Sequence, residues 1–426
     1  MAVEYRRRVV DAELADRLEA VGAIVIEGPK ACGKTATARQ VAASEVLLDV
    51  DAQARLAADA APGLVLAGAT PRLIDEWQVE PRIWDHVRRA VDDRSAPGQF
   101  ILTGSSVPPD DVTRHSGAGR LTRLRMRPMS LHESGRGSGT VSLAALMRGE
   151  PPSAADSGLT VEELAEEIAL GGWPGFRGLT TRQGLSAVRD YLSEVQRVDV
   201  GRVDGRRRDP DRVMRLTRSL ARNVATYAAA TTLASDTGGA DGPLKDDTVR
   251  DYLTALERLM IVEDQAAWAP RMRSRTALRS AAKRHFVDPS LAVAALDTTP
   301  DRLLGDLESL GFLFESLVVR DLRIYAQAND ARVLQFRDAA GLEVDAVVES
   351  RAGGWMAFEV KLGQRQIDAA AQALTRFAAK VDTQHIGPPT TLGVIVATGY
   401  AYQRSDGVAV IPVGALCPCV MLPRQA

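Results

Sequence analysis

The chain has 426 residues, 45% of them apolar, a length that suggests about two to four domains with sizeable cores. A net charge of −2 argues against a uniformly basic protein surface that binds nucleic acid. It is still compatible with local basic patches. No stretch approaches the ~20 apolar residues that span a bilayer, and the three cysteines cannot build a disulfide framework. We therefore expect a cytoplasmic globular protein with no membrane partner.

The first motif is a complete phosphate-binding loop, G-x-x-x-x-G-K-[ST]. An apolar run at 23–26 precedes it and a helix-forming stretch begins at Ala36. Backbone N–H groups of such a loop wrap phosphates, and the helix that follows points its positive end at the anion. We expect Lys34 to reach the β- and γ-phosphates and Thr35 to ligate Mg²⁺. The predicted nucleotide-binding residues, for ATP or GTP, are Gly28, Pro29, Lys30, Ala31, Cys32, Gly33, Lys34 and Thr35.

Two further strands complete an ATPase site. Leu73-Ile74-Asp75-Glu76 has the residue order of a Walker-B strand. Asp75 would hold Mg²⁺ and Glu76 would deprotonate the attacking water, although an ordinary strand end with acidic residues would read the same in isolation. The strand at 100–106 ends in hydroxyls, and we predict Thr103, with Ser105 next, as the residue that senses the γ-phosphate. Between residues 21 and 103 such strands alternate with helical stretches, which predicts a parallel sheet covered by helices.

Arginines after this strand suggest a residue that acts across a subunit boundary. Arg114 and Arg120 both follow it closely, and we favour Arg120 as an arginine finger delivered to a neighbouring subunit. The alternative is a surface arginine without a catalytic role. The finger requires a homo-oligomer, for which a hexamer is one assembly.

The middle of the chain is predicted to be helical. Loop-like stretches at 134–139, 149–153 and 235–243 combine Gly, Pro and small polar residues and mark boundaries or surface loops. From 161 to 233 the apolar period is mostly that of a helix.

A helix-turn-helix pattern follows the last of these loops. Residues 244–262 read as a capped amphipathic helix, and a basic stretch with a short strand at 285–287 comes next. This outline is that of a winged helix whose wing contacts DNA phosphates. The alternative is a solvated loop with internal ion pairs to Asp246, Asp247 or Asp251. The residues we predict to contact DNA are Arg271, Arg273, Arg275, Lys283 and Arg284.

Carboxylates and a lysine alternate on two strands near the end of the chain. Asp345 can face Glu359 across a hairpin, and Lys361 shares a strand face with Glu359. Two carboxylates that hold Mg²⁺ beside an ammonium are what metal-dependent phosphodiester cleavage requires, so Asp345, Glu359 and Lys361 are candidate catalytic residues. Glu315 on an upstream helix and Gln372 on a downstream one could join them. An E-x-K pattern alone is weak, because strand alternation often produces it.

These motifs follow one another over nearly the whole chain: the loop at 28–35, Asp75-Glu76-Trp77-Gln78, the strand at 100–106, the stretch from Gly119-Arg120 to 127–133, Gly171-Gly172-Trp173-Pro174, and the strands at 343–345 and 359–361. Their order resembles prokaryotic AAA-type ATPases whose C-terminal half is the domain of unknown function 4143. The resemblance implies an α/β protein with an AAA-type P-loop core at 1–145, a helical lid and connector at 146–235, a winged-helix segment at 236–298 and a restriction-endonuclease-like domain at 299–426. The glycine-rich loops at 134–140 and 236–243 are longer than the family pattern needs.

Three functions fit these expectations. The leading one is an ATP- and Mg²⁺-dependent ATPase that acts on DNA, in particular branched or structured DNA. The second is a regulatory or partner-binding switch in which the nuclease-like fold is an inactive scaffold. The third is an ATP-licensed, Mg²⁺-dependent nuclease. Fold similarity does not decide between them.

Overall fold

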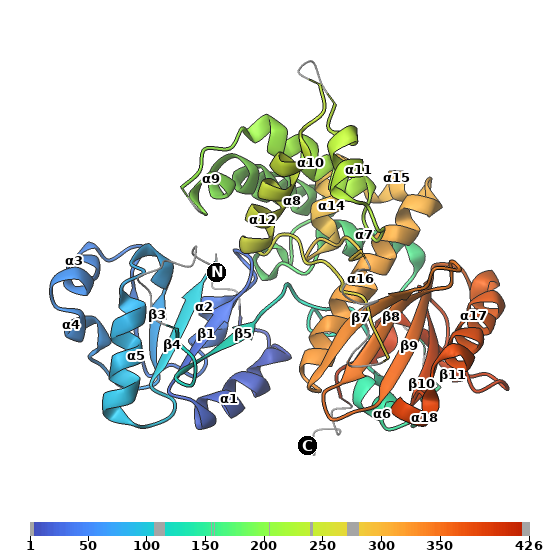
Figure 1. Cartoon of the computed structure of the whole chain (residues 1–426), viewed down its shortest axis with the longest axis horizontal. Coiled ribbons are helices and arrows are strands. Elements are labelled where there is room, and N and C mark those ends of the chain that lie inside the picture. The colour runs from blue at the N-terminus through green and yellow to red at the C-terminus, as the bar shows by residue number, and fades with distance from the viewer. Residues whose placement is uncertain are drawn as a thin grey trace.

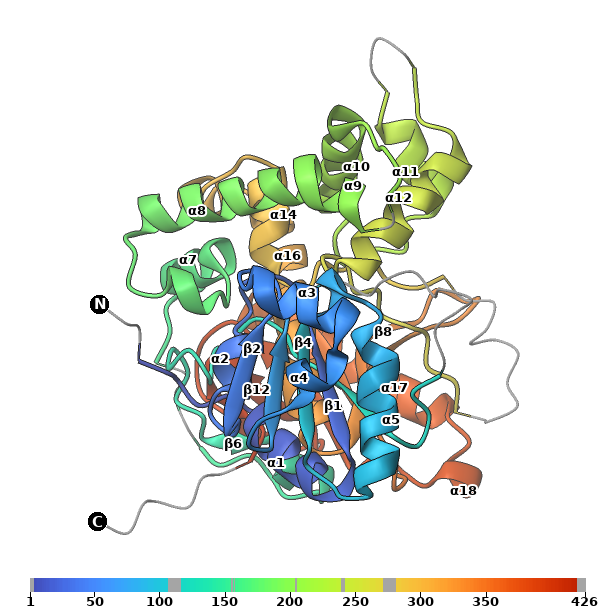
Figure 2. The same cartoon turned by 90° about the vertical axis from the view of Figure 1, so that its left-hand side faces the viewer.

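The computed structural model describes residues 4–105, 116–154, 156, 158–203, 205–238, 242–270 and 281–419. Figures 1 and 2 show a blue α/β unit formed by the N-terminal quarter, an orange to red α/β unit formed by the C-terminal quarter, and a green and yellow helical region above both. Within the described residues, no helix is long and apolar enough to cross a membrane.

The N-terminal unit is a parallel five-stranded sheet between two helical layers. Its strand order is β2-β3-β4-β1-β5, with bounds Ala23–Glu27 (β1), Ser44–Leu47 (β2), Arg72–Asp75 (β3), Phe100–Gly104 (β4) and Leu121–Arg125 (β5). Apolar side chains of α5 (Ile83–Arg94), α3 (Ala52–Ala60) and α4 (Pro62–Leu66) pack on one face. Those of α1 (Val10–Ala20) and α2 (Lys34–Ala38) pack on the other. Both faces of β1 and β4 are buried, as the continuous apolar runs of these strands predict.

The helical region begins after the strand β6 (Val141–Ser142) and α6 (Leu143–Met147). Its helices are α7 (Val161–Leu170), α8 (Thr181–Glu194), a π-helical turn at Val195–Asp199, α9 (Val200–Arg202), α10 (Pro210–Arg222), α11 (Ala230–Asp236), α12 (Asp246–Arg258), α14 (Pro289–Ala295) and α15 (Pro300–Leu304). Thr160 and Thr180 form capping boxes that start α7 and α8. The predicted helix after 244 is confirmed as α12. The predicted strand at 285–287 is reduced to an isolated bridge between Phe286 and Val262, and a second bridge joins Lys283 to Gln265.

The C-terminal unit is a six-stranded sheet of order β11-β12-β10-β9-β8-β7. The strands are β7 (Ala331–Arg337), β8 (Glu343–Ser350), β9 (Trp355–Lys361), β10 (Thr391–Val396), β11 (Tyr402–Gln403) and β12 (Ala409–Pro412), and a short β13 (Leu416–Cys417) pairs with β6. β7, β8 and β9 are antiparallel, whereas β9, β10 and β12 are parallel. α17 (Ile367–Lys380) covers one face, and the short α18 (Thr383–Ile386) follows it.

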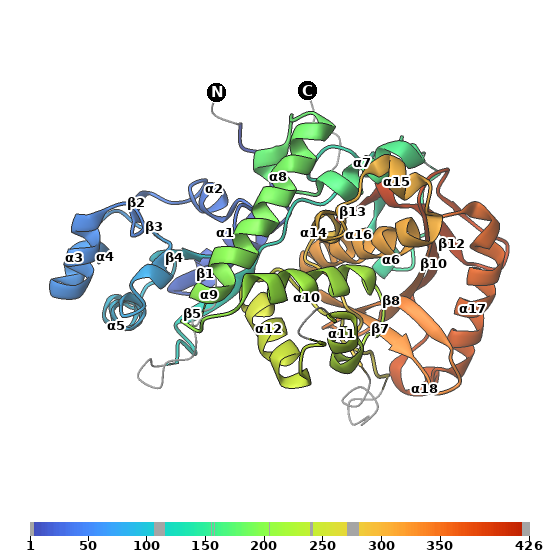
Figure 3. The same cartoon turned by 90° about the horizontal axis from the view of Figure 1, so that it is seen from above.

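The long helix α16 (Leu307–Gln327) joins the C-terminal sheet to the helical region. It packs on the C-terminal sheet, and its apolar residues belong to one continuous core with those of α7, α10, α12 and α14. Seen from above, α16 runs beneath α10 toward the N-terminal unit (Figure 3). Because one core spans these parts, packing does not mark the boundaries predicted at 235 and 298, and the four-part division stays a prediction.

Candidate functional site

The phosphate-binding loop lies where the sequence predicts it, between the end of β1 and the start of α2. A Cβ on Gly28 would lie 2.3 Å from the carbonyl oxygen of Met126, so a side chain at this position would collide with backbone. Gly33, which caps α2, has φ 105°, a backbone conformation that favours glycine. Lys34 is buried, and its Nζ donates to the carbonyl oxygens of Gly28 at 3.0 Å and Pro29 at 2.9 Å. Its hydrogen-bond partners here are backbone dipoles, which leave its charge unneutralised.

Three of the predicted catalytic and metal-binding residues meet beside this loop. Thr35 Oγ1 donates to Asp75 Oδ1 at 2.9 Å, and the hydroxyl of Thr103 donates to the same oxygen. Asp75 and Thr103 are register partners on the parallel strands β3 and β4, so both side chains emerge at the same edge of the sheet. A hydroxyl and a carboxylate beside a phosphate-binding loop are oxygen donors of the kind Mg²⁺ takes, so Thr35 and Asp75 fit their predicted role as ligands.

Glu76 is held in an unusual conformation next to this cluster. Its φ of 53° lies in the left-handed region, which is uncommon for a residue with a side chain. Its Oε2 accepts from the amide of Gln78 and from Ser105 Oγ at 3.3 Å. Strained backbone concentrates at functional sites when surrounding contacts hold it in place. Gln78 and Ser105 therefore orient the proposed base, and the sequence analysis gave neither this role.

Arg8 links the phosphate-binding loop to residues that follow β5, and the sequence analysis did not predict this role. Arg8 is buried and donates to the carbonyl oxygens of Cys32 at 2.8 Å and Arg127 at 2.7 Å, and its Nε pairs with Glu133 at 3.0 Å. Glu133 has a lowered pKa, because Arg8 and backbone N–H groups outweigh the effect of burial. No local pattern could have found Arg8, since Glu133 lies 125 residues away.

The helical region touches the loop at Lys30. Lys30 Nζ pairs with Asp199 Oδ1 at 2.6 Å, and the hydroxyl of Tyr191 donates to the Lys30 carbonyl at 3.3 Å. The predicted lid is thus in contact with the predicted nucleotide-binding residues.

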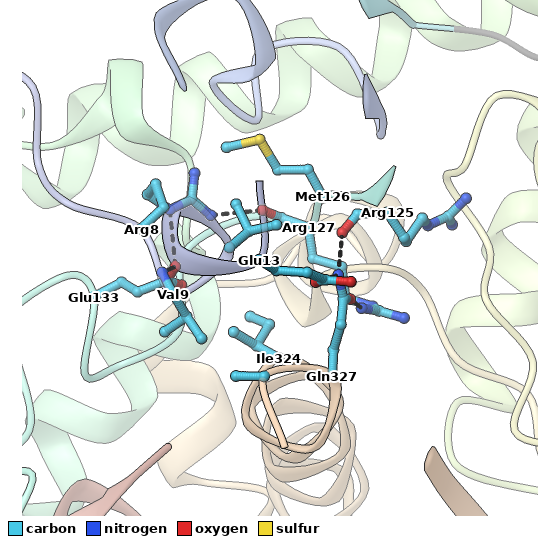
Figure 4. A pocket seen from close by; sticks show the side chains of 11 residues that line it. Arg8, Val9, Glu13, Arg125, Met126, Arg127, Glu133, Ile324 and Gln327 are labelled. Atoms are coloured by element: carbon cyan, nitrogen blue, oxygen red, sulfur yellow. Dashed lines mark hydrogen bonds and ion pairs between the residues drawn. The ribbon is translucent and has the colours of Figure 1, made fainter. Parts of the chain in front are cut away.

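A small cavity marks the joint between the N-terminal unit and α16 (Figure 4). Gln327, at the end of α16, donates to Glu13 Oε2 at 2.8 Å and to the Arg125 carbonyl at 2.9 Å. Arg127 pairs with Glu263 at 2.6 Å and donates to Gln327 Oε1 at 2.8 Å. The cavity volume is about 20 Å³, room for little more than a water molecule, so this is a contact between parts of the chain and no ligand site.

Arg120 lies at the opposite edge of the sheet from the loop. It precedes β5, whose first residue Leu121 is the register partner of Ala23 at the start of β1. Its side chain is exposed and pairs with Asp92 at 2.8 Å. Arg120 therefore does not reach the phosphate-binding loop of its own chain. Its role as a finger toward a neighbouring subunit stays a prediction.

The predicted DNA-contacting wing needs correction where it is described. Arg271, Arg273 and Arg275 lie outside the described residues. Lys283 is buried, 3% exposed, and paired with carboxylates of the C-terminal unit, so its ammonium faces the interior and not a phosphate. Arg284 pairs with Asp264 and donates to the Ala228 carbonyl at 3.2 Å. Both residues thus form internal ion pairs, as the alternative prediction expects. Their partners, however, are not the aspartates that this prediction named.

Lys283 instead belongs to a carboxylate–lysine centre that contains all three predicted nuclease residues. We define this centre as Glu315, Asp345, Glu359, Lys283 and Lys361. Lys361 Nζ lies 2.6 Å from Glu359 Oε2 and 3.3 Å from Asp345 Oδ2. Lys283 Nζ donates to Glu315 Oε1 and lies 3.2 Å from Asp345 Oδ1. The two-residue strand period brought Asp345, Glu359 and Lys361 together as predicted, and Glu315 on α16 joins them. Gln372 is exposed on α17 and no contact places it in the centre.

Burial and charge shift the proton affinities in this centre. Burial, helped by the Asp345 carboxylate, raises the pKa of Glu315 to about 8 and that of Glu359 to about 7. Although burial disfavours its charge, Lys283 and Lys361 hold the pKa of Asp345 below its usual value. The same carboxylates raise the pKa of both lysines against the effect of burial. Asp345 therefore keeps its charge beside the two ammonium groups, while Glu315 and Glu359 hold their protons more tightly than free carboxyls.

The metal-binding role predicted for Asp345 and Glu359 does not fit this arrangement well. Among the described residues, no group of three or more His, Cys, Asp or Glu side chains is placed to hold a metal ion. Lys283 lies between Glu315 and Asp345, in a position where a divalent cation would otherwise balance their charge.

Three family models match the chain. Residues 21–135 match an AAA domain, residues 161–302 match the domain of unknown function DUF8612, and residues 310–416 match the domain of unknown function DUF4143. The predicted combination of an AAA-type P-loop domain with the domain of unknown function 4143 is thereby confirmed, as is the α/β fold class. The DUF8612 match covers helices on both sides of the boundary predicted at 235.

One solved structure similar to the chain is the Walker-type ATPase PABY2304 of Pyrococcus abyssi. It is 14% identical, and the match covers 69% of this chain and 99% of that one with a TM-score of 0.41. No curated protein matches the chain.

Proposed function

We propose that this chain, which combines an AAA-type P-loop domain with the domain of unknown function 4143, binds ATP with Mg²⁺ and hydrolyses it. The observation that carries the proposal is the convergence of Thr35, Asp75 and Thr103 beside a complete phosphate-binding loop. A phosphate-binding loop alone would support ATP binding. A carboxylate held in a fixed orientation beside the loop, as that of Glu76 is, supports ATP hydrolysis as well.

Each residue then has a chemical task. The Lys34 ammonium offsets the charge of the β- and γ-phosphates, and the N-terminal end of α2 adds its dipole. Mg²⁺, when bound, neutralises charge that develops on the phosphate oxygens, and Thr35 and Asp75 would hold it. Glu76 takes the proton of the attacking water, while Gln78 and Ser105 keep its carboxylate in place. Thr103 fixes Asp75 and senses the γ-phosphate.

For the work that hydrolysis drives, we favour action on DNA, branched or structured, by a homo-oligomer. Support comes from the side-by-side arrangement of Asp345, Glu359 and Lys361 on two strands, the pattern of phosphodiester-handling folds. The contact of Lys30 with Asp199 and the joint at Gln327 give routes by which nucleotide binding could move the helical region and α16.

A second candidate is a regulatory or partner-binding switch with an inactive nuclease-like scaffold. The position of Lys283 favours it over an ATP-licensed nuclease, because an internal ammonium already balances the carboxylates that would have to hold a metal. Magnesium-dependent nicking of DNA by the wild-type chain, lost in Lys361→Ala, would establish the nuclease instead.

ATP turnover measured with no DNA and with linear, single-stranded and four-way DNA separates these candidates. Action on DNA predicts turnover that rises with DNA and most with four-way DNA. A switch predicts turnover that no DNA changes. Turnover no faster than that of Glu76→Gln under every condition would contradict the ATPase itself.

A further inference from the structure

The outer face of α10 carries an unusual row of arginines. Arg212, Arg215, Arg218 and Arg222 recur every three or four residues and therefore lie on one face of the helix. Arg218 and Arg222 are exposed, and Arg212 and Arg215 are partly exposed. The opposite face buries Val213, Leu216, Thr217 and Leu220 against the helical core, which fixes the arginines outward.

Three of these arginines lack the acidic partners that several other exposed arginines of the chain have. Between Arg212 and Ser235 the sequence contains no Asp or Glu. Arg212 lies 3.5 Å from Asp209, but Arg215, Arg218 and Arg222 form no ion pair with any described residue. Asp236, the first carboxylate that follows this stretch, accepts from Ser219 Oγ at 3.2 Å and from Asn223 Nδ2 at 3.1 Å instead.

On α5 an arginine lies between acidic residues of its own helix, in contrast to Arg218 and Arg222 of α10. On α5, Arg88 lies 3.8 Å from both Asp85 and Asp92, at the spacing that stabilises helices. On α10, like charges take the same spacing, which costs stability. The helix dipole accounts for Arg222 in the last turn but not for Arg215 or Arg218. An anionic partner would remove this repulsion.

We propose that the α10 arginine face, defined as Arg212, Arg215, Arg218 and Arg222, holds the phosphate backbone of DNA. This inference rests on the proposed action on DNA and replaces Lys283 as its contact. From Arg212 to Arg222 the face is about 15 Å long at 1.5 Å per residue. That length of duplex carries roughly nine phosphate charges.

The chemistry of the face favours phosphate over a protein partner. Guanidinium groups bind phosphate oxygens in pairs of hydrogen bonds. A protein interface would need buried apolar anchors, and Met214, 50% exposed, is the one large apolar side chain that α10 exposes. Figure 3 shows α10 lying across the face of the molecule turned to the viewer, in front of α16.

The test is the salt dependence of binding to fluorescent linear and four-way DNA, followed by anisotropy. For Arg215→Ala/Arg218→Ala/Arg222→Ala we expect binding weakened about tenfold or more and a slope of log K against log salt flatter by roughly 0.9 for each lost contact. The corresponding triple lysine variant should keep most of the slope, because it retains the charge. ATP turnover without DNA should be unchanged, which shows that the variant folds.

A matched control removes the same charge elsewhere. Arg82, Arg148 and Arg351 are exposed and paired with Asp59, Glu150 and Asp330. Their triple alanine variant should bind DNA like the wild type. If the α10 variant and this control have equal affinity and slope, the α10 face is not the contact, although DNA remains a partner. If the wild type binds no DNA and acidic peptides bind instead, both the face and the proposed action on DNA are overturned.

Discussion

Lys34 and Lys283 are both buried lysines beside predicted catalytic carboxylates, yet their surroundings differ. Lys34 donates to two backbone carbonyls, whereas Lys283 contacts Glu315 and Asp345. A buried charge is costly unless it is paired. The phosphate-binding loop therefore holds a cation that an anionic ligand can still neutralise, while the carboxylate–lysine centre has largely neutralised itself. Residue types alone do not distinguish a site that awaits a ligand from one whose charges are already paired.

The largest effect should follow from removing the unpaired cation. Lys34→Ala should abolish ATP binding, because it removes the buried ammonium that offsets the charge of the β- and γ-phosphates. Calorimetry checks this. Lys380→Ala, whose lysine pairs with Asp338 on the surface, is the control and should bind ATP as the wild type does. Tight ATP binding by Lys34→Ala would show that the charge of Lys34 is not needed by the ligand, and Lys34 would then not differ from Lys283 in this respect.

How much of the fold and of the two sites could be predicted from the sequence depends on how far apart the interacting residues lie along the chain. The loop, Asp75 and Thr103 were predictable because parallel strands end at one edge of a sheet, and Asp345 and Glu359 because strands have a period of two. Lys283 was placed on a wing because its basic neighbours are local, whereas its partners lie 32 and 62 residues away. The roles of Arg8 and of the α10 face were not predicted for a similar reason, because the packing of distant elements decides which arginines have partners.

Arg120 should affect hydrolysis without affecting binding. Because it lies at the sheet edge opposite the loop, Arg120→Ala should bind ATP normally and lose roughly a thousandfold in turnover if it completes a neighbour's site. Mixing it with Lys34→Ala should restore some activity. Arg88→Ala, which removes another partner of Asp92, is the control. A monomer by sedimentation that keeps full turnover would contradict this prediction.

Removing Lys283 should destabilise the protein rather than impair the nucleotide site. Lys283→Met leaves Glu315 without its ammonium partner and Asp345 with Lys361 alone, and we expect a loss of about 3–5 kcal/mol in urea unfolding. The double variant Lys283→Met/Glu315→Gln should recover part of this loss, and ATP affinity should stay that of the wild type. Unchanged stability in the single variant would mean that Lys283 does not neutralise the centre.

A smaller effect concerns pH. Since the pKa of Glu315 is raised from about 4.5 to about 8, its protonated form is favoured on folding. Its contribution to stability is complete below pH 4.5 and is lost as pH rises through 8. Glu315→Gln cannot ionise at this position. Its unfolding free energy, relative to that of the wild type, should therefore increase as the pH rises between these two values. A difference between the two proteins that is independent of pH would show that the Glu315 pKa is not raised.

Steady-state ATP turnover of the wild type beside Glu76→Gln tests the central claim most directly. The amide matches the carboxylate in shape but cannot accept a proton, so we expect ATP binding to persist while turnover falls by at least about a hundredfold. Equal turnover of the two proteins, with or without DNA, would contradict the assignment of the loop, Asp75 and Glu76 as a hydrolytic site.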